Sequence, residues 1–256
     1  VAEKIGLVDK PNFRKRHQGL IPLIGGIALF LGNLTFYAFQ YDTMPLPGLY
    51  LLSVTILLFI GILDDRFDIS PALRAGIQAV LAGAMIYSGL ELESLGQIIA
   101  PFSIKLGFFS LLFTVFITIG VINAFNMVDG IDGLLAGLSS VSFAGIGVLM
   151  WINGEHAIAF WCLAIILTLI PYAMFNLSLF GAKWKVFMGD SGSTLIGFTI
   201  IWMLLLSTQG QGHAISPITG LWLIAVPLID MVAVIFRRLK KGKSPFRPDR
   251  LHLHHL

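Results

Sequence analysis

Acidic side chains gather in three short clusters of this 256-residue chain, and each cluster borders an apolar run. The first cluster is Asp64-Asp65-Arg66-Phe67-Asp68. Carboxylates at the C-terminal end of a helix face the negative end of its dipole, so they need a positive partner. Two interpretations stay open: a solvated helix end paired with Arg66 and Arg74, or carboxylates that organise Mg²⁺ or act as base toward a phosphorylated substrate.

The second cluster contains two Asp-Gly pairs, within Asn126-Met127-Val128-Asp129-Gly130-Ile131-Asp132-Gly133. Glycine permits a tight turn and the close approach of a ligand. The simpler alternative is that Asp129 and Asp132 cap the helix that follows. Because capping explains one aspartate better than it explains both together with Asn126, the pattern favours a binding loop.

The third cluster opens another apolar run, with the sequence Phe187-Met188-Gly189-Asp190-Ser191-Gly192-Ser193. Free N–H groups and the positive dipole end at a helix N-terminus attract anions, and a carboxylate there could hold a metal ion that bridges phosphates. The alternative for Asp190 is a plain N-cap. Phe187 either faces lipid or stacks on a nucleotide base, and the residue pattern by itself favours lipid.

A fourth group of residues, near the end of the sequence, is basic. His252, His254 and His255 closely follow Arg247 and Arg250. Histidine-rich tracts can bind metal ions. Since the carboxylates elsewhere in the chain already suit a hard cation, we expect these histidines to contact phosphate or nucleotide groups instead.

The composition indicates which elements must position these groups. Hydrophobic residues make up 56% of the chain and charged residues only 12%, with a mean hydropathy of +0.86, whereas a soluble domain carries about 25% charged residues. An ordinary cytosolic enzyme and a disordered protein are thereby excluded, and the single cysteine, Cys162, excludes a disulfide scaffold.

Apolar runs of membrane-spanning length recur along the chain. Because unbroken runs satisfy their backbone in lipid as helices, we predict an all-α, polytopic membrane bundle with about eight transmembrane helices. The second and seventh runs are short, so we expect them to extend into their polar flanks or to cross a thinned region. The runs cover residues 20–39, 49–63, 72–90, 106–125, 134–152, 157–175, 193–207 and 218–236.

The basic residues predict the orientation of this bundle. Of the 17 Lys and Arg, all but Lys105 fall in the N-terminal segment or in the connections that carry the aspartate clusters and the histidines. The positive-inside rule places these connections in the cytoplasm. We therefore predict a single integral-membrane domain over residues 1–256. Its catalytic loops are expected on the cytoplasmic side near residues 64–74, 123–134, 183–193 and 237–256.

Taken together, these motifs resemble those of the polyprenyl-phosphate N-acetylhexosamine-1-phosphate transferases, a membrane family (glycosyltransferase family 4) that includes the enzyme making lipid I. The resemblance extends over the whole sequence, and it implies that at least one N-terminal span and one or more C-terminal spans of the family are missing from it. Leu253 stands where the family would have isoleucine, which is a conservative departure. The matching pieces are Asp64-Asp65, 126–134, 187–193 and 252–255.

The resemblance implies a reaction, and the stretches 6–17 and 123–126 look most like the enterobacterial branch of the family. In that branch UDP-N-acetylglucosamine and undecaprenyl phosphate give undecaprenyl-diphospho-N-acetylglucosamine and UMP, with Mg²⁺ or Mn²⁺ as cofactor. The reaction begins lipopolysaccharide O-antigen or enterobacterial common antigen synthesis at the bacterial inner membrane. The expected partners are the two substrates and the lipid bilayer; no nucleic acid is expected, and a homodimer is left open.

The resemblance also implies roles for individual residues. Asp190 is the expected metal ligand, helped by Asn126, which also contacts substrate. Asp64 is the expected base or nucleophile. The other expected catalytic residues are Asp65, Asp129, Asp132 and His252. The other expected substrate-binding residues are Asp132 and Phe187 near the uracil ring, and His252, His254 and His255 near the phosphates and the sugar.

Two other functions compete with a transferase. An intramembrane Mg²⁺-dependent prenyltransferase also uses Asp-rich motifs, and residues 64–68 superficially match one, but the chain has no second motif of this kind. A lipid or ion transporter would bind its cargo near the membrane midplane, whereas the aspartate clusters border the runs and only Asp230 lies well inside one. Both functions therefore rank below the transferase.

Overall fold

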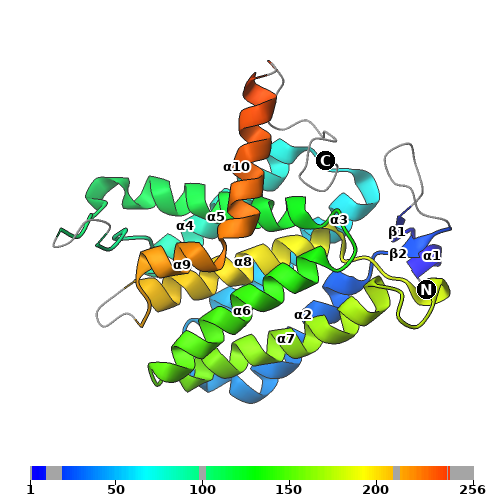
Figure 1. The fold of residues 1–256 in the computed structure, drawn as a ribbon, viewed down its shortest axis with the longest axis horizontal. Helices are drawn as coiled ribbons and strands as arrows, with labels where there is room; N and C mark the ends of the chain where they lie inside the picture. The colour runs from blue at the N-terminus through cyan, green and yellow to red at the C-terminus, as the bar shows by residue number, and fades with distance from the viewer. Residues whose placement is uncertain (1, 10–18, 98–101, 210–213, 241, 243–256) are drawn as a thin grey trace.

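The computed structural model describes residues 2–9, 19–97, 102–209, 214–240 and 242, and helices dominate this part of the chain (Figure 1). Residues 243–256 lie outside the described residues. They include the whole basic group of the sequence analysis, Arg247, Arg250, His252, His254 and His255. The elements are α1 Ala2–Ile5, β1 Val8–Asp9, β2 Ile21–Pro22, α2 Gly25–Gln40, η1 Tyr41–Thr43, α3 Pro47–Phe67, α4 Pro71–Tyr87, η2 Gly107–Phe109, α5 Ser110–Val128, α6 Leu134–Ile152, α7 His156–Asn176, η3 Ala182–Trp184, α8 Gly189–Thr208, α9 Pro217–Leu223 and α10 Ala225–Lys240.

All eight apolar runs form helices, which confirms the prediction of an all-α membrane bundle, but the count of about eight spans is only approximate. Within the described residues, five helices are long and apolar enough to cross a membrane, and the bent pair α9–α10 would make a sixth. Helices α2 and α4 have 16 and 17 residues, whereas a perpendicular crossing takes about 20. The protein is therefore a multi-pass membrane protein with two helices of marginal length.

The last run is not the single straight helix that we expected. It breaks at Ile224, and α10 leaves α9 at an angle of 75°, so that α10 runs in a different direction from α9 and packs against α5 (Figure 1). The cause is Pro227, three residues into α10. Proline has no N–H to donate to the carbonyl of Leu223, and its ring clashes with that carbonyl.

Helix α8 is the centre of the bundle (Figure 1). It packs against α2, α3, α5 and α6, and all of its residues except Asp190 and Leu206 are buried. Its hydroxyl groups bond to carbonyls of the preceding turn, as Thr199 does to Leu195 at 2.8 Å. Because protein surrounds the first polar turn, α8 begins four residues before the predicted run. Helix α3 likewise extends into its acidic flank.

Two glycines let neighbouring helices approach the backbone of α8. A Cβ on Gly61 of α3 would lie 2.6 Å from the backbone nitrogen of Ser191, and one on Gly197 of α8 would lie 2.7 Å from the Cα of Ile122 in α5. Small residues at such crossings are typical of membrane helices, because dispersion contacts between backbones replace the hydrophobic effect there.

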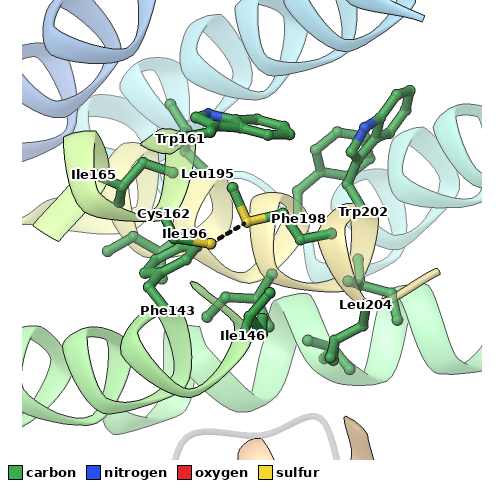
Figure 2. Packing of buried hydrophobic residues seen from close by; sticks show 14 of the residues in the cluster. Phe143, Ile146, Trp161, Cys162, Ile165, Leu195, Ile196, Phe198, Trp202 and Leu204 are labelled. Atoms are coloured by element: carbon green, nitrogen blue, oxygen red, sulfur yellow. Dashed lines mark hydrogen bonds between the residues drawn. The ribbon is translucent and has the colours of Figure 1, made fainter. Parts of the chain in front are cut away.

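Aromatic and aliphatic side chains fill the space between α6, α7 and α8 (Figure 2). Phe143 of α6 and Cys162 of α7 are both fully buried in this cluster. The Cys162 Sγ atom lies 3.5 Å from the sulfur of Met203. Cys162 is a free thiol, as a chain with one cysteine requires.

A buried hydrogen-bond network joins four helices at a distance from the acidic clusters. The Trp161 indole donates to the Asn33 side-chain oxygen at 2.9 Å, and the Asn33 amide donates to the Tyr50 hydroxyl at 2.6 Å. The Tyr50 hydroxyl then contacts Thr199 Oγ1 at 2.8 Å. Since Asn33 serves both as donor and as acceptor, it connects α2 to α3 and to α7.

The Asn33→Ala substitution is therefore expected to destabilise the fold by about 1–3 kcal/mol, because it leaves the Trp161 indole and the Tyr50 hydroxyl short of partners in a dry interior. Thermal unfolding of the purified protein in detergent measures this loss. The matched control is Asn153→Ala: the Asn153 side chain is exposed and bonds only to the Leu149 carbonyl of its own helix. Equal melting temperatures for both variants would contradict the prediction.

Candidate active site at the ends of α3, α5 and α8

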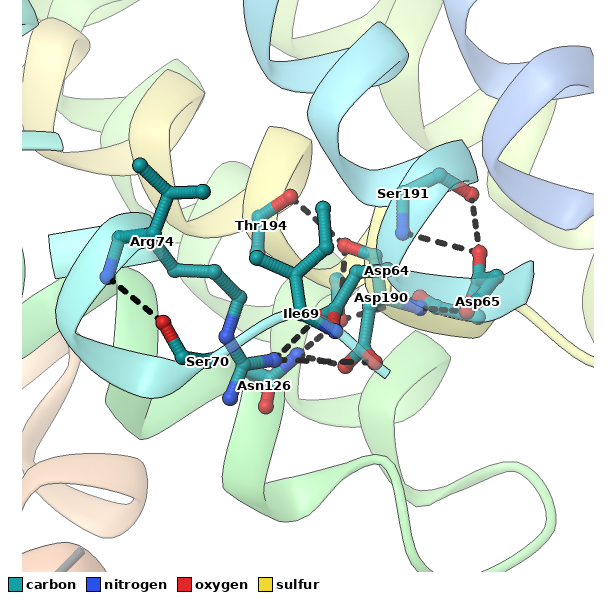
Figure 3. Close-up of polar contacts among 12 residues, drawn as sticks. Asp64, Asp65, Ile69, Ser70, Arg74, Asn126, Asp190, Ser191 and Thr194 are labelled. Atoms are coloured by element: carbon teal, nitrogen blue, oxygen red, sulfur yellow. Dashed lines mark hydrogen bonds and ion pairs between the residues drawn. The ribbon is translucent and has the colours of Figure 1, made fainter. Parts of the chain in front are cut away.

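Asp64 and Asp65 lie in the last turn of helix α3, but they face different neighbours (Figure 3). The Asp64 side chain is only 2% exposed and forms an ion pair with Arg74. Its other oxygen accepts a hydrogen bond from the backbone of Ile69 at 2.8 Å. Asp64 thus has one partner in the turn that follows α3 and one in the first turn of α4.

A tight reversal of the chain brings Arg74 to Asp64. Asp68 adopts a left-handed conformation with φ of 54°, and its N–H bonds to the Asp64 carbonyl at 2.9 Å. Ser70 then caps α4, whose first residue is Pro71. Of the two arginines in the solvated-end interpretation, Arg74 pairs with Asp64, whereas the Arg66 guanidinium lies 5.0 Å from the centre of the Phe67 ring.

Asp65 caps the N-terminus of α8. Its carboxylate accepts hydrogen bonds from the backbone N–H of Asp190 at 2.7 Å, from that of Ser191 at 3.3 Å and from the Ser191 hydroxyl at 3.0 Å. Gly189 makes room for this contact, because a Cβ there would lie 2.6 Å from an Asp65 oxygen. Gly189 also has φ of +76°, a conformation that favours glycine. The observed partners of Asp65 are thus the free N–H groups of a neighbouring helix, and a catalytic role for it stays a prediction.

Asp190 lies where three helices meet. The Asn126 amide of α5 donates to one Asp190 oxygen and, at 2.9 Å, to the Ser193 hydroxyl. The other Asp190 oxygen lies 3.7 Å from the Arg74 guanidinium, and the side chain is 36% exposed. A continuous polar chain therefore runs from Asp64 through Arg74 and Asp190 to Asn126, and the structure brings together the first, second and third clusters.

The donor atoms in this chain suit a hard divalent cation. Among the described residues, no three His, Cys, Asp or Glu side chains are placed to hold a metal ion by themselves. Magnesium commonly binds to one or two carboxylates and takes its remaining oxygens from substrate phosphates and water. The partly exposed Asp190 carboxylate, with the Asn126 amide beside it, fits a site of this kind.

Asp132, Lys185 and Phe187 form a separate group, which we call the rim. The Lys185 ammonium pairs with Asp132 and lies 5.4 Å from the centre of the Phe187 ring. Gly133 occupies the N-cap position of α6, so neither Asp129 nor Asp132 is the N-cap residue of that helix. Asp129 is instead the C-cap residue of α5.

Backbone pairing with the N-terminal part of the chain holds Phe187 in place. Its N–H donates to the Pro22 carbonyl at 3.0 Å, and its carbonyl accepts from Gly25 at 3.1 Å. The Gly26 N–H likewise donates to the Met188 carbonyl, at 3.1 Å. The beginning of α2 is thereby joined to the segment that leads into α8.

Sequence reasoning missed one residue of this region. The buried Asn176 ends α7, accepts from the Gly133 N–H at 2.6 Å and donates to the Val186 carbonyl at 3.0 Å. It thus ties the loop of the second cluster to the segment before the third. The only available signal was a polar amide at the end of an apolar run. The sequence predicts Arg74 only as a counter-charge for the first cluster, whereas the structure shows that it contacts both Asp64 and Asp190.

Comparisons with known proteins agree on one family. The family model described as glycosyl transferase family 4 matches residues 48–208, which include all three aspartate clusters. Undecaprenyl-phosphate alpha-N-acetylglucosaminyl 1-phosphate transferases are close relatives. That of Haemophilus influenzae is 66% identical over the whole chain and 73% of its own length, and that of Pasteurella multocida is 64% identical over the whole chain and 72% of its length. The Escherichia coli K12 protein of this name is 57% identical over the whole chain and 70% of its length. The chain therefore belongs to glycosyl transferase family 4.

Proposed function

We propose that this protein transfers N-acetylglucosamine 1-phosphate from UDP-N-acetylglucosamine to undecaprenyl phosphate, with release of UMP. The observation that carries the proposal is the Asp190 carboxylate, partly exposed between the Asn126 amide and the Arg74 guanidinium at the end of the central helix. The names of relatives that are 57–66% identical support the same reaction. The product would be undecaprenyl-diphospho-N-acetylglucosamine, made in a single membrane domain whose catalytic loops face the cytoplasm at the inner membrane.

Positioning and charge neutralisation dominate phosphoryl transfer. Asp190 and Asn126 would hold Mg²⁺ or Mn²⁺, which when bound would neutralise charge on the diphosphate and on the departing UMP. Arg74, held between Asp64 and Asp190, is placed to pair with phosphate oxygens as well. In this proposal the negative charge of the substrates is neutralised by Arg74 of α4 and by a cation held by Asn126 of α5 and Asp190 of α8.

Asp64 acts in this proposal mainly by holding Arg74. The phosphate of the acceptor has a second pKa of about 6, so at pH 7 it is mostly dianionic and needs little help from a base. Both Asp64 oxygens already have partners, Arg74 and the Ile69 N–H. These contacts favour an orienting carboxylate over a nucleophile that forms a covalent intermediate.

The nucleotide would bind at the rim. Phe187 would offer a ring face to the uracil. Lys185 contacts both the Phe187 ring and the Asp132 carboxylate, so Asp132 would also lie near the base. Asp129 lies at the end of α5, three residues from Asn126, and would complete the acidic loop. His252, His254 and His255, which lie outside the described residues, are proposed to contact the phosphates and the sugar. This arrangement leaves the lipid acceptor to approach from the bilayer.

The test of the function is UMP release by the purified protein in detergent with undecaprenyl phosphate, Mg²⁺ and individual UDP-sugars. We expect UMP with UDP-N-acetylglucosamine and only when the lipid phosphate is present. Release of inorganic diphosphate from a prenyl diphosphate would indicate a prenyltransferase instead. Absence of UMP with every UDP-N-acetylhexosamine would overturn the proposal.

Lys185→Met is expected to raise the KM for UDP-N-acetylglucosamine about 5- to 20-fold with little change in kcat, because the proposed role of the ammonium is to hold Asp132 beside Phe187 where the nucleotide would bind. Steady-state kinetics of UMP release provide the measurement. The control is Lys105→Met, since Lys105 lies just before η2 and the start of α5, at the opposite end of that helix from Asn126. A large fall in kcat at unchanged KM would show that Lys185 acts in the chemical step.

A further inference from the structure

Residues 177–185, the first part of the connection between α7 and α8, expose an unusual number of apolar side chains. Single exposed apolar residues are common on protein surfaces, but clusters of them indicate a partner or a membrane. The same nine residues include two lysines, Lys183 and Lys185, and no acidic residue. The apolar side chains, each between 49% and 64% exposed, are Leu177, Leu179, Phe180 and Trp184.

The backbone of this connection satisfies many of its own hydrogen bonds. The N–H of Leu179 bonds to the Met174 carbonyl at 3.0 Å, that of Gly181 to Ser178 at 2.9 Å and that of Trp184 to Gly181 at 3.0 Å. The Phe180 ring also packs 5.0 Å from the ring of Phe175 in α7. A loop with satisfied backbone groups can enter a medium of low polarity at modest cost.

The position and the charge of residues 177–185 indicate that the surrounding medium is a membrane surface. The connection directly follows α7, which is long and apolar enough to cross a membrane, so it emerges at the level of a bilayer surface. The Lys183 ammonium lies 5.9 Å from the centre of the Trp184 ring. Tryptophan next to lysine is the residue pair that membrane interfaces favour: the indole enters the glycerol region, and the ammonium reaches anionic lipid phosphates.

We propose that residues 177–185 lie within the headgroup layer of the leaflet at the site end of the bundle, with Leu179, Phe180 and Trp184 inserted and Lys183 on anionic lipid phosphates. The connection is joined to the rim at both ends. Asn176 precedes it and bonds to Gly133, and Lys185 ends it in the ion pair with Asp132. The last step rests on the proposed function: the loop then keeps the rim, where the nucleotide would bind, at the same depth in the membrane as the phosphate of the lipid acceptor.

Spin labels test the insertion without any assay of activity. Single cysteines replace Leu179 and Phe180 in a Cys162→Ala background, and the labelled full protein is reconstituted in vesicles of phosphatidylethanolamine and phosphatidylglycerol. Collision with oxygen reports lipid, and collision with a water-soluble nickel chelate reports solvent. The controls are labels at Asn153, exposed in the connection at the opposite end, and at Leu167, exposed in the middle of α7.

We expect the labels at 179 and 180 to meet the nickel chelate about fivefold less often than the label at 153. They should meet oxygen more often than the label at 153 but less often than the label at 167, because the oxygen concentration falls from the bilayer centre toward the headgroups. Equal access to the chelate at 153, 179 and 180 would show that the loop faces water. Low access to both reagents would show that protein covers it. Either result overturns the proposal, and neither depends on whether UMP is released.

Discussion

Asp190→Asn is expected to lower turnover at least about a thousandfold while the protein stays folded. Asparagine has the shape of aspartate and keeps an oxygen that can accept from the Asn126 amide. It lacks the charge that a divalent cation requires and that faces Arg74 across 3.7 Å. Because the loss lies in charge and not in packing, moderate extra Mg²⁺ should not restore activity.

Two measurements check this result. Kinetics of UMP release give the turnover, and electron paramagnetic resonance of added Mn²⁺ gives the affinity for the cation, which should weaken in the variant. The control is Asp42→Asn, because Asp42 lies in η1 at the opposite end of the bundle. Near-normal turnover of Asp190→Asn would mean that Asp190 does not hold the metal.

The neighbouring aspartates Asp64 and Asp65 are expected to give different phenotypes on substitution. Asp65→Ala removes three hydrogen bonds from the first turn of α8, so we expect it to destabilise the protein by about 2–4 kcal/mol. Asp64→Asn keeps a side chain of the same shape near Arg74 and Ile69 but removes the charge. It should leave the fold nearly intact and lower turnover about a hundredfold, since Arg74 is then poorly held.

Thermal unfolding in detergent and UMP release, measured on the same preparations, separate these effects. Asp68→Asn is the control within the cluster, because asparagine tolerates the left-handed backbone found there, and its effect should stay below about 0.5 kcal/mol. Asp65→Asn, which keeps one acceptor oxygen, should fall between wild type and Asp65→Ala in stability. If Asp65→Ala melts like wild type but is inactive, then Asp65 acts in catalysis and its capping contacts are incidental.

The family and the location of the site could be predicted from the sequence. The length of an apolar run determines whether a segment can be a membrane helix, and each of the eight runs is helical. The order of the runs brings residues 64–68, 126–133 and 187–193 to the same end of the bundle. Both features follow from local patterns, because a helix in lipid satisfies its own backbone and a span must end where polar residues begin.

The division of roles at the site was decided by tertiary structure alone. Successive residues of a helix point about 100° apart, so Asp64 faces the start of α4 while Asp65 faces the start of α8. Nothing in the dipeptide shows which neighbour lies on which side. In the same way Arg74 reaches Asp190, and Asn176 joins two loops, only because α3, α4, α7 and α8 pack as they do. Hydropathy predicts which segments become helices; the packing of helix faces, which involves residues far apart in the chain, determines which side chains meet.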